Sequence, residues 1–293
     1  MQEGSKAYRL AYLAPCRVSA LNTPFTTDFV FTTDFAMNPK MSNGFMPPTN
    51  RKSSICSVVL ATCQGERFIG EQLDSIVSQL SPTDEIILSD DASSDGTLNA
   101  VRQRGDARIR ILANRERVGY IRNFQRAIDQ VRGEYVFFAD QDDVWLPGKV
   151  DSICSALRKR PFAASDAIVV NEKLEQLHQS YFELREARAF SWPAIFLRPR
   201  IIGATMSCRK DYLQTLLPLP SQIPHDFWLT LNAAWDESLE IIHTPLILYR
   251  RHAAALSPTA TNRSRSLAKI AAERCILATT MIHRRLRLRA RKA

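Results

Sequence analysis

The segment 135–145 constrains the fold of this chain more than any other. It opens with an apolar run rich in aromatic residues, from Tyr135 to Ala139, which is typical of a buried strand. Three carboxylates follow, Asp140, Asp142 and Asp143. Since neighbouring like charges repel one another, we expect Asp140 and Asp142 to face one hard cation, Mg²⁺ or Mn²⁺, shared with the phosphates of a substrate. For the motif by itself, a solvated acidic turn is the simpler interpretation.

Two more strands are predicted to end in polar residues. Residues 85–91 form an apolar strand that ends in Asp90 and Asp91, and a helix is predicted over 97–104. Residues 55–61 form the third strand, which runs into a polar segment and then a helical pattern. Strand, loop and helix thus repeat over 55–158, which predicts βαβ units and a mostly parallel sheet. Ligands bind such sheets at the carboxyl ends of the strands, so the three polar loops should converge on one crevice.

Six short segments between residues 53 and 255 carry a resemblance to a known family. They are Ala-Thr-Cys-Gln-Gly-Glu at 61–66, Ser-Asp-Asp-Ala-Ser-Ser-Asp-Gly-Thr at 89–97, Ala-Asp-Gln-Asp-Asp-Val-Trp at 139–145, Gly-Ala-Thr-Met at 203–206, His-Asp-Phe-Trp at 225–228 and Leu-Tyr-Arg-Arg-His at 248–252. Together they resemble the family 2 glycosyltransferases, which are inverting enzymes with the GT-A fold. The likeness is greatest to the bacterial rhamnosyltransferase-like members.

The resemblance implies a role for each motif. The donor would be a nucleotide-diphosphate sugar, and Asp142, with help from Asp140, would hold the metal. Asp226 would be the general base that takes a proton from the acceptor hydroxyl, since inversion in one displacement needs a base opposite the leaving group. The residues implied in nucleotide-sugar binding are Thr62, Glu66, Asp90, Asp91, Asn123, Asp140 and His252, the last of them together with Arg250 or Arg251.

Several of these residues have a structural alternative that the sequence leaves open. Thr62 could cap a loop, and Glu66 could cap the following helix. Asn123 could lie on the solvated face of the helix predicted over 119–131. Asp226 could be the N-cap of a helix over 227–233, and His252 could cap a loop.

The chain departs from the family pattern at two loops. Cys63 and Gln64 stand where the family has Tyr and Asn, and Ala92 replaces a Gly after the acid pair. If residue 92 needs a positive φ, Ala carries a conformational cost there that Gly does not. Every carboxylate assigned to chemistry is nevertheless present.

The pattern divides the 293 residues into three parts. Residues 1–52 show no sustained helical or strand period and contain a short duplication, which predicts a disordered leader. Residues 53–262 are expected to form the GT-A domain, with a nucleotide-sugar half over 53–158 and an acceptor half over 159–262. Residues 263–293 form a basic amphipathic tail, predicted to contain a helix.

The positive charge is confined to that tail. The whole chain has a formal net charge of +9, and residues 263–293 hold ten Lys and Arg and one acid. The rest is therefore neutral, which argues against a nucleic-acid-binding protein. A basic amphipathic helix is typical of a membrane-surface element, and six cations from Arg284 onwards could contact an anionic leaflet. A solvated tail, or a helix packed on the domain, is the alternative.

These observations favour an inverting glycosyltransferase. It would move a sugar, such as rhamnose or another deoxyhexose, to a glycan or lipid-linked glycan. A catalytically inactive nucleotide-sugar binder is the alternative. A nucleotidyltransferase fits less well because the sequence has no Gly-rich phosphate loop followed by Lys. With no apolar run of transmembrane length and no signal peptide, we expect a cytoplasmic protein, attached to the inner face of the cytoplasmic membrane if the tail binds lipid.

Overall fold

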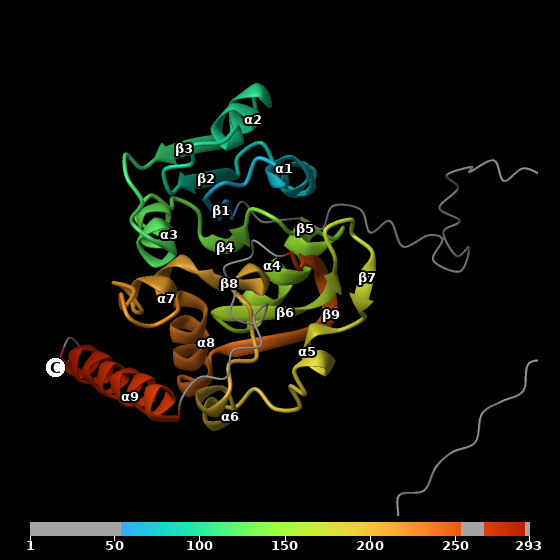
Figure 1. The fold of residues 1–293 in the computed structure, drawn as a ribbon. Helices are drawn as coiled ribbons and strands as arrows, with labels where there is room; N and C mark the ends of the chain where they lie inside the picture. The colour runs from blue at the N-terminus through green and yellow to red at the C-terminus, as the bar shows by residue number, and fades with distance from the viewer. Residues whose placement is uncertain (1–53, 253–266, 291–293) are drawn as a thin grey trace, which may run out of the picture. The chain divides into compact units, whose positions relative to one another are not determined.

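The computed structural model describes residues 54–252 and 267–290 (Figure 1). The predicted leader lies outside these residues. The elements are β1 (Cys56–Thr62), α1 (Ile69–Val77), β2 (Glu85–Asp90), α2 (Thr97–Gln103), β3 (Ile109–Ala113), α3 (Tyr120–Ile128), β4 (Tyr135–Asp140), β5 (Val144–Trp145), α4 (Lys149–Lys159), β6 (Phe162–Val170), β7 (Gln176–His178), α5 (Tyr181–Leu184), α6 (Trp192–Leu197), η2 (Gly203–Thr205), β8 (Met206–Arg209), α7 (Lys210–Gln214), α8 (His225–Trp235), β9 (Leu239–Arg250) and α9 (Leu267–Ala290).

One sheet runs through the described residues in the order β3-β2-β1-β4-β8-β6-β9-β5, with β7 paired to β6. The neighbours β3, β2, β1 and β4 are all parallel, as the strand–loop–helix repeat predicts. The acceptor half is mixed, because β8 runs antiparallel to both β4 and β6 while β6 and β9 are parallel. This α/β architecture is the one expected for a GT-A fold.

Apolar side chains of the central strands form the core. In β1, β2 and β4 the interior positions are fully buried, so these strands read as continuous apolar runs, as parallel strands covered on both faces do. α3 packs on β1 and β2, whereas α4 packs on β6, β8 and β9. The carboxylates Asp90 and Asp140 stand at the carboxyl ends of β2 and β4, which places them at one edge of the sheet.

The apolar run at residues 201–207 has the pattern of a strand, but only its end is one. Residues 203–205 form the 3₁₀ helix η2, and β8 begins only at Met206. The glycine of this turn explains the difference, since a Cβ at Gly203 would lie 2.9 Å from His225 Nε2. The segment therefore serves as a close-packed turn against α8 rather than as strand.

The C-terminal helix is present and packs on the domain. α9 buries Leu277 and Met281, as well as the guanidinium of Arg284. The structure therefore corrects the idea that all six terminal cations face a membrane, because Arg284 and Arg285 contact Asp236 of the body. Of the described helices, none combines the length and the apolar character needed to cross a bilayer.

The two departures in the loops both fall at strained backbone positions. Ala92 has φ of 55° and Gln64 has φ of 54°. The family pattern of Gly and Asn at these sites is the one expected for left-handed conformations, which cost other residues about 1–2 kcal/mol. The concern raised for Ala92 from the sequence is therefore confirmed.

We expect Ala92→Gly to raise the free energy of unfolding by about 1 kcal/mol, because glycine adopts a positive φ without the Cβ clash. Ala100→Gly, inside α2, is the matched control and should lower it by about 1 kcal/mol. Urea unfolding of both variants checks the pair. A loss of stability in Ala92→Gly equal to that of the control would show that residue 92 is not strained.

Candidate active site

The three polar loops converge at one edge of the sheet. Parallel pairing places Thr62 beside Asp90, and Asp140 ends the strand on the other side of β1. The side chain of Gln141 then joins two loops, since its Oε1 accepts from Cys63 N at 2.7 Å and its Nε2 donates to Cys63 O at 3.0 Å. The convergence predicted from the sequence is confirmed.

Asp90 and Asp91 are buried and use their oxygens to shape these loops. Asp90 Oδ2 accepts from the hydroxyls of Thr62 at 2.9 Å and Ser93 at 2.6 Å. Asp91 accepts from the backbone N–H groups of residues 118–119 at 2.7 and 3.0 Å. Each carboxylate has further lone pairs that could accept from a nucleobase, but both carboxylates already fix the walls of the crevice.

Asn123 and Glu66 also hold the loops together. The Asn123 amide donates to Ser89 O at 2.8 Å and accepts from Ser89 Oγ at 2.7 Å. Asn123 is buried, so it does not lie on a solvated helix face. Glu66 Oε2 accepts from Gly96 N at 2.9 Å, at the start of α2 rather than of its own following helix. Both side chains therefore hold the loops of the nucleotide-sugar half in place at this edge of the sheet.

The third loop brings the carboxylate of Asp142 against His252. Their Oδ2 and Nε2 atoms lie 2.7 Å apart, and both side chains are largely buried. Arg250 does not reach toward this carboxylate or into the crevice. Its Nε donates to the backbone oxygen of Asp142 at 2.7 Å and its Nη2 to Glu71 Oε2 at 2.5 Å. Arg250 therefore holds the acidic loop through the backbone of Asp142.

A buried Asp and Lys lie behind this loop, and the sequence pattern did not identify them as partners. Asp143 Oδ1 accepts from Arg250 N at 3.0 Å, and Oδ2 has no partner in the described part of the chain. Lys149 Nζ donates to Ala204 O at 3.0 Å. Burial raises the pKa of Asp143 and lowers the pKa of Lys149 to about 7, while the attraction between the two groups opposes both changes. Lys149 connects the acidic loop to the turn at 203–205.

Asp226 meets the acidic loop from the opposite half of the domain. It lies in the first turn of α8, half-buried, with Oδ1 accepting from Phe227 N at 2.8 Å. Burial, and then the charges of Asp142 and Asp226, raise the pKa of Asp140 to about 7. The pKa of Asp140 is therefore influenced by carboxylates of both the nucleotide-sugar half and the acceptor half. Pro224, not Asp226, is the N-cap residue of α8.

His225 is a site residue that the motif did not single out. Its ring stacks on Phe124 at 4.1 Å, and neither ring nitrogen has a partner among the described residues. Burial lowers the pKa of this imidazole, which favours the neutral form. Its packing against Gly203 holds the start of α8, and therefore Asp226, close to the acidic loop.

These side chains fit a divalent cation that is completed by the substrate. In the described ranges, no three His, Cys, Asp or Glu side chains group into a full set of metal ligands. Mg²⁺ and related ions commonly take one or two carboxylates and complete their shell with water and substrate phosphates. The raised pKa of Asp140 and the unpartnered Oδ2 of Asp143 show an uncompensated acidic centre. Asp140 and Asp142 present carboxylates at this end of the sheet, and the imidazole of His252 lies against Asp142.

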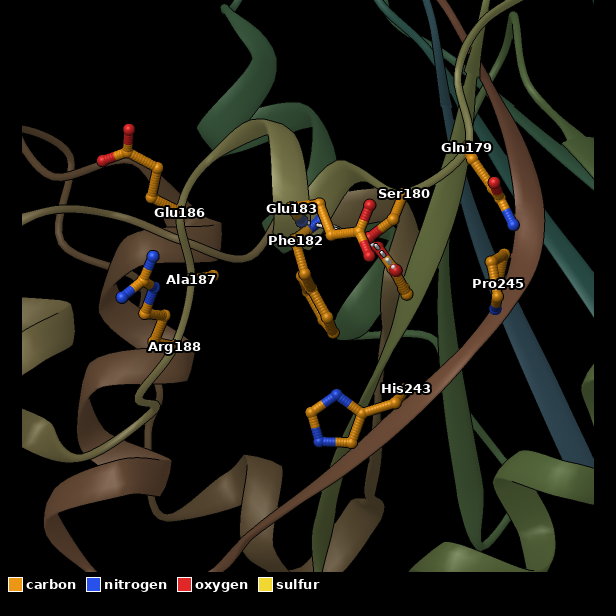
Figure 2. A pocket seen from close by; sticks show the side chains of 10 residues that line it. Gln179, Ser180, Phe182, Glu183, Glu186, Ala187, Arg188, His243 and Pro245 are labelled. Atoms are coloured by element: carbon orange, nitrogen blue, oxygen red, sulfur yellow. Dashed lines mark hydrogen bonds between the residues drawn. The ribbon is translucent and has the colours of Figure 1, made fainter.

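A cavity of about 530 Å³ lies in the acceptor half, between α5 and β9 (Figure 2). Phe182, Glu183 and His243 line it, and Figure 2 shows their side chains around one space. Tyr181, the preceding residue, is buried against Tyr249. Burial, and to a lesser extent the charge of Asp226, raises the pKa of its hydroxyl. The short helix α5 therefore contributes to both the cavity and the surroundings of the base candidate.

The comparisons identify the family of this chain. The family model described as glycosyl transferase family 2 matches residues 57–254. The chain belongs to this family. Among its relatives, dTDP-rhamnosyl transferase RfbG of Shigella flexneri is 37% identical over 105 residues, which cover 33% of this chain and 36% of that protein. The Escherichia coli enzyme UDP-Glc:alpha-D-GlcNAc-diphosphoundecaprenol beta-1,3-glucosyltransferase WfgD is 28% identical over 105 residues, which cover 36% and 42%.

A solved structure of similar fold is glucosyl-3-phosphoglycerate synthase from Mycobacterium tuberculosis, in complex with Mn²⁺, uridine diphosphate and phosphoglyceric acid. Its TM-score is 0.52 at 19% identity, covering 79% of this chain and 78% of that one. This likeness confirms the GT-A fold of the family 2 domain. The chain spans less than half the length of the curated relatives described above, so its substrates are inferred from the site.

Asp140→Asn should stabilise the metal-free domain at pH 8 by about 1–3 kcal/mol, and the gain should vanish near pH 4. A carboxyl whose pKa is raised from 3.8 to about 7 in the folded state loses stability as the pH rises through that range. The amide carries no charge, so its variant avoids this loss. Thermal melts in EDTA at several pH values measure the difference.

Ser94→Ala, at an exposed position of a neighbouring loop, is the control for the melts and should show no such pH dependence relative to the wild type. A gain from Asp140→Asn that is the same at pH 4 and pH 8 would contradict the electrostatic origin.

Proposed function

We propose that this protein is an inverting glycosyltransferase that transfers a sugar from a nucleotide-diphosphate sugar to a glycan or lipid-linked glycan. One observation carries the proposal: the turn at 203–205 packs on the start of α8 beside Asp226, and its Ala204 carbonyl accepts from Lys149 behind the acidic loop. The base candidate and the acidic loop are therefore held against one turn, and the charge of Asp226 helps to raise the pKa of Asp140. The family match supports the reaction class.

The side chains divide the work of a single displacement. The Asp226 carboxylate accepts the proton of the acceptor hydroxyl as its oxygen forms a bond to the sugar carbon. The bond from that carbon to the diphosphate breaks, and its electrons leave with the nucleoside diphosphate. A bound Mg²⁺ or Mn²⁺, held by Asp142 with Asp140 and His252, would neutralise the charge of the leaving group. Asp90, Asp91 and Thr62 form the wall that receives the nucleoside.

The relatives support the finer parts of the proposal. RfbG is named for dTDP-rhamnose, which supports rhamnose or another deoxyhexose as the donor sugar. WfgD is named for a diphosphoundecaprenol acceptor, which supports a lipid-linked glycan. The synthase structure contains Mn²⁺ and uridine diphosphate, which supports the metal. An inactive nucleotide-sugar binder would keep the donor crevice but would not need Asp226 beside it.

The decisive pair of variants is Asp226→Asn and Asp142→Ala. We expect Asp226→Asn to keep donor binding and to lower turnover on the order of 10²–10⁴-fold, because the amide cannot take the proton. Asp142→Ala should lose Mn²⁺-dependent donor binding and turnover together. Donor binding is measured by calorimetry with nucleotide sugars, and turnover by release of nucleoside diphosphate.

Asp151→Asn, on the first turn of α4 outside the site, is the charge-matched control and should behave like the wild type. Wild-type turnover in Asp226→Asn would rule out the base role. Donor binding by the wild type with no release of nucleoside diphosphate over a panel of acceptors would favour the inactive binder.

A further inference from the structure

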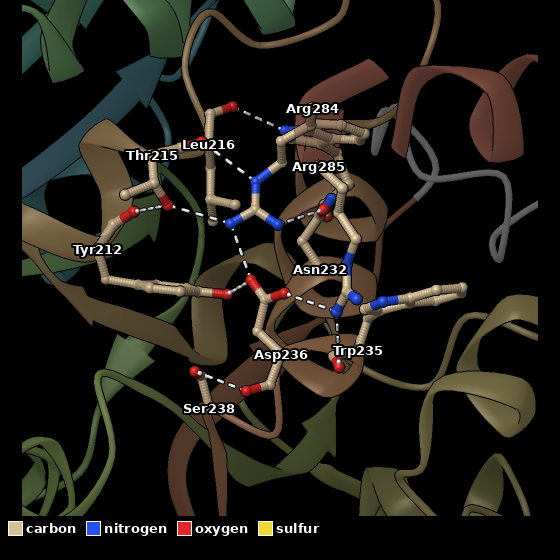
Figure 3. A network of polar contacts seen from close by, with 10 residues as sticks. Tyr212, Thr215, Leu216, Asn232, Trp235, Asp236, Ser238, Arg284 and Arg285 are labelled. Carbon is tan, nitrogen blue, oxygen red and sulfur yellow. Dashed lines mark hydrogen bonds and ion pairs between the residues drawn. The ribbon is translucent and has the colours of Figure 1, made fainter. Parts of the chain in front are cut away.

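Arg284 fixes α9 to the rest of the domain (Figure 3). Its side chain is 5% exposed, and its Nη2 lies 2.8 Å from Asp236 Oδ2. Nη1 donates to Asn232 Oδ1 at 3.1 Å, and Nε donates to Thr215 O at 3.1 Å. A buried cation with this many partners is costly to separate from them. α9 is therefore held in one orientation against the end of α8.

The inward face of α9 packs against the rest of the domain. Leu277 and Met281 are buried in the core, and the guanidinium of Arg274 lies 4.5 Å from the ring centre of Phe227. These positions are spaced by three or four residues, as one face of a helix requires. The apolar stripe predicted from the sequence is thus used mainly for packing on the domain.

The outward face of α9 carries a second apolar stripe, which the sequence pattern did not reveal. Ile282 and Leu286 are each 56% exposed and lie four residues apart, one above the other. Arg287 and Arg289 are exposed on the two sides of this pair. An exposed apolar pair flanked by cations is unusual for a face that only contacts water.

α6 also carries exposed apolar side chains. Its last residue, Leu197, is 77% exposed, and the Leu197 carbonyl accepts from Arg274 Nη2 at 3.4 Å. At the other end of α6, Trp192 is 40% exposed and packs on Trp235 at 4.3 Å, over which Arg285 lies. α6 therefore meets α9 where the Leu197 carbonyl accepts from Arg274, and Trp235 of α8 lies between Trp192 and Arg285.

We propose that the outward face of α9 rests on an anionic lipid bilayer. Apolar side chains flanked by cations match the acyl boundary and the phosphate layer of such a surface. The chain continues beyond α9 with Arg291 and Lys292, which add to the same charge.

The position of this surface bears on the acceptor. α8 has Asp226 in its first turn and Asp236 just past its last residue. Its 11 residues span roughly 16 Å, so the base candidate stands about that far along α8 from the α9 contact. This separation suits a short glycan on a lipid diphosphate. Only this statement about the acceptor rests on the proposed function, because lipid binding itself does not.

Vesicle co-sedimentation of the full chain tests the proposal. We expect binding to phosphatidylglycerol-rich vesicles and weak binding to phosphatidylcholine vesicles. R287Q/R289Q should weaken the binding to anionic vesicles on the order of 30-fold, since each cation near an anionic leaflet contributes about a fivefold factor. I282S/L286S should weaken binding to the same vesicles at high salt, where the apolar contribution remains.

Matched controls carry the same changes elsewhere. R102Q/R132Q removes two exposed arginines of the nucleotide half, and I55S/L177S removes two exposed apolar side chains. Both should bind like the wild type. Unchanged binding in both α9 variants, with melting temperatures equal to the wild type, would overturn the proposal, as would equal binding to both kinds of vesicle. Nucleoside diphosphate release in solution is measured separately, so failure of the catalytic proposal is distinguished from failure of this one.

Discussion

The parallel pairing of β2, β1 and β4 at matched register is the constraint on which the rest of the site depends. It makes three strands end at one level, with Thr62 paired to Asp90 and Ala61 paired to Asp140. A shift of one residue would send the side chains at these ends to the opposite face of the sheet. The fully buried interiors of the three strands prevent such a shift. The chemistry of the loops is therefore placed by the packing of the core.

This arrangement gathers carboxylates that would otherwise avoid one another. Asp140, Asp142 and Asp143 come from one loop, and Asp226 approaches from the other half. The protein offsets part of the repulsion with cations that it holds beneath the loop. Arg250 binds the backbone of Asp142, and Lys149 lies close enough to Asp143 to attract it. The remaining acidity faces the crevice, where a cation and a diphosphate would relieve it.

The acceptor half shows how one helix can serve two sites. α8 begins at His225 and Asp226, beside the acidic loop, and ends where Asn232 and Asp236 hold Arg284 of α9. Because a helix is rigid over this length, the orientation of α9 and the position of the base are linked. Docking of α9 on a lipid surface would therefore set how an acceptor reaches Asp226.

The sequence alone determined the elements and most of the site. Alternating strand, loop and helix patterns predicted the parallel half, because core-facing runs and polar strand ends are local features. The acidic strand end indicated Asp140 and Asp142, and the family resemblance added Asp226 and His252; the structure places His252 against Asp142. The tertiary structure alone decided which polar side chains form hydrogen bonds that hold the fold together. Asn123, Arg250 and Arg284 are all polar residues in helical or strand segments, and nothing in their local pattern shows that each is buried among partners distant in the chain. The same limit applies to α9: its period predicts one apolar stripe, but only the contacts with the domain show that this stripe packs inward while Ile282 and Leu286 stay exposed, because burial is a property of the assembled core.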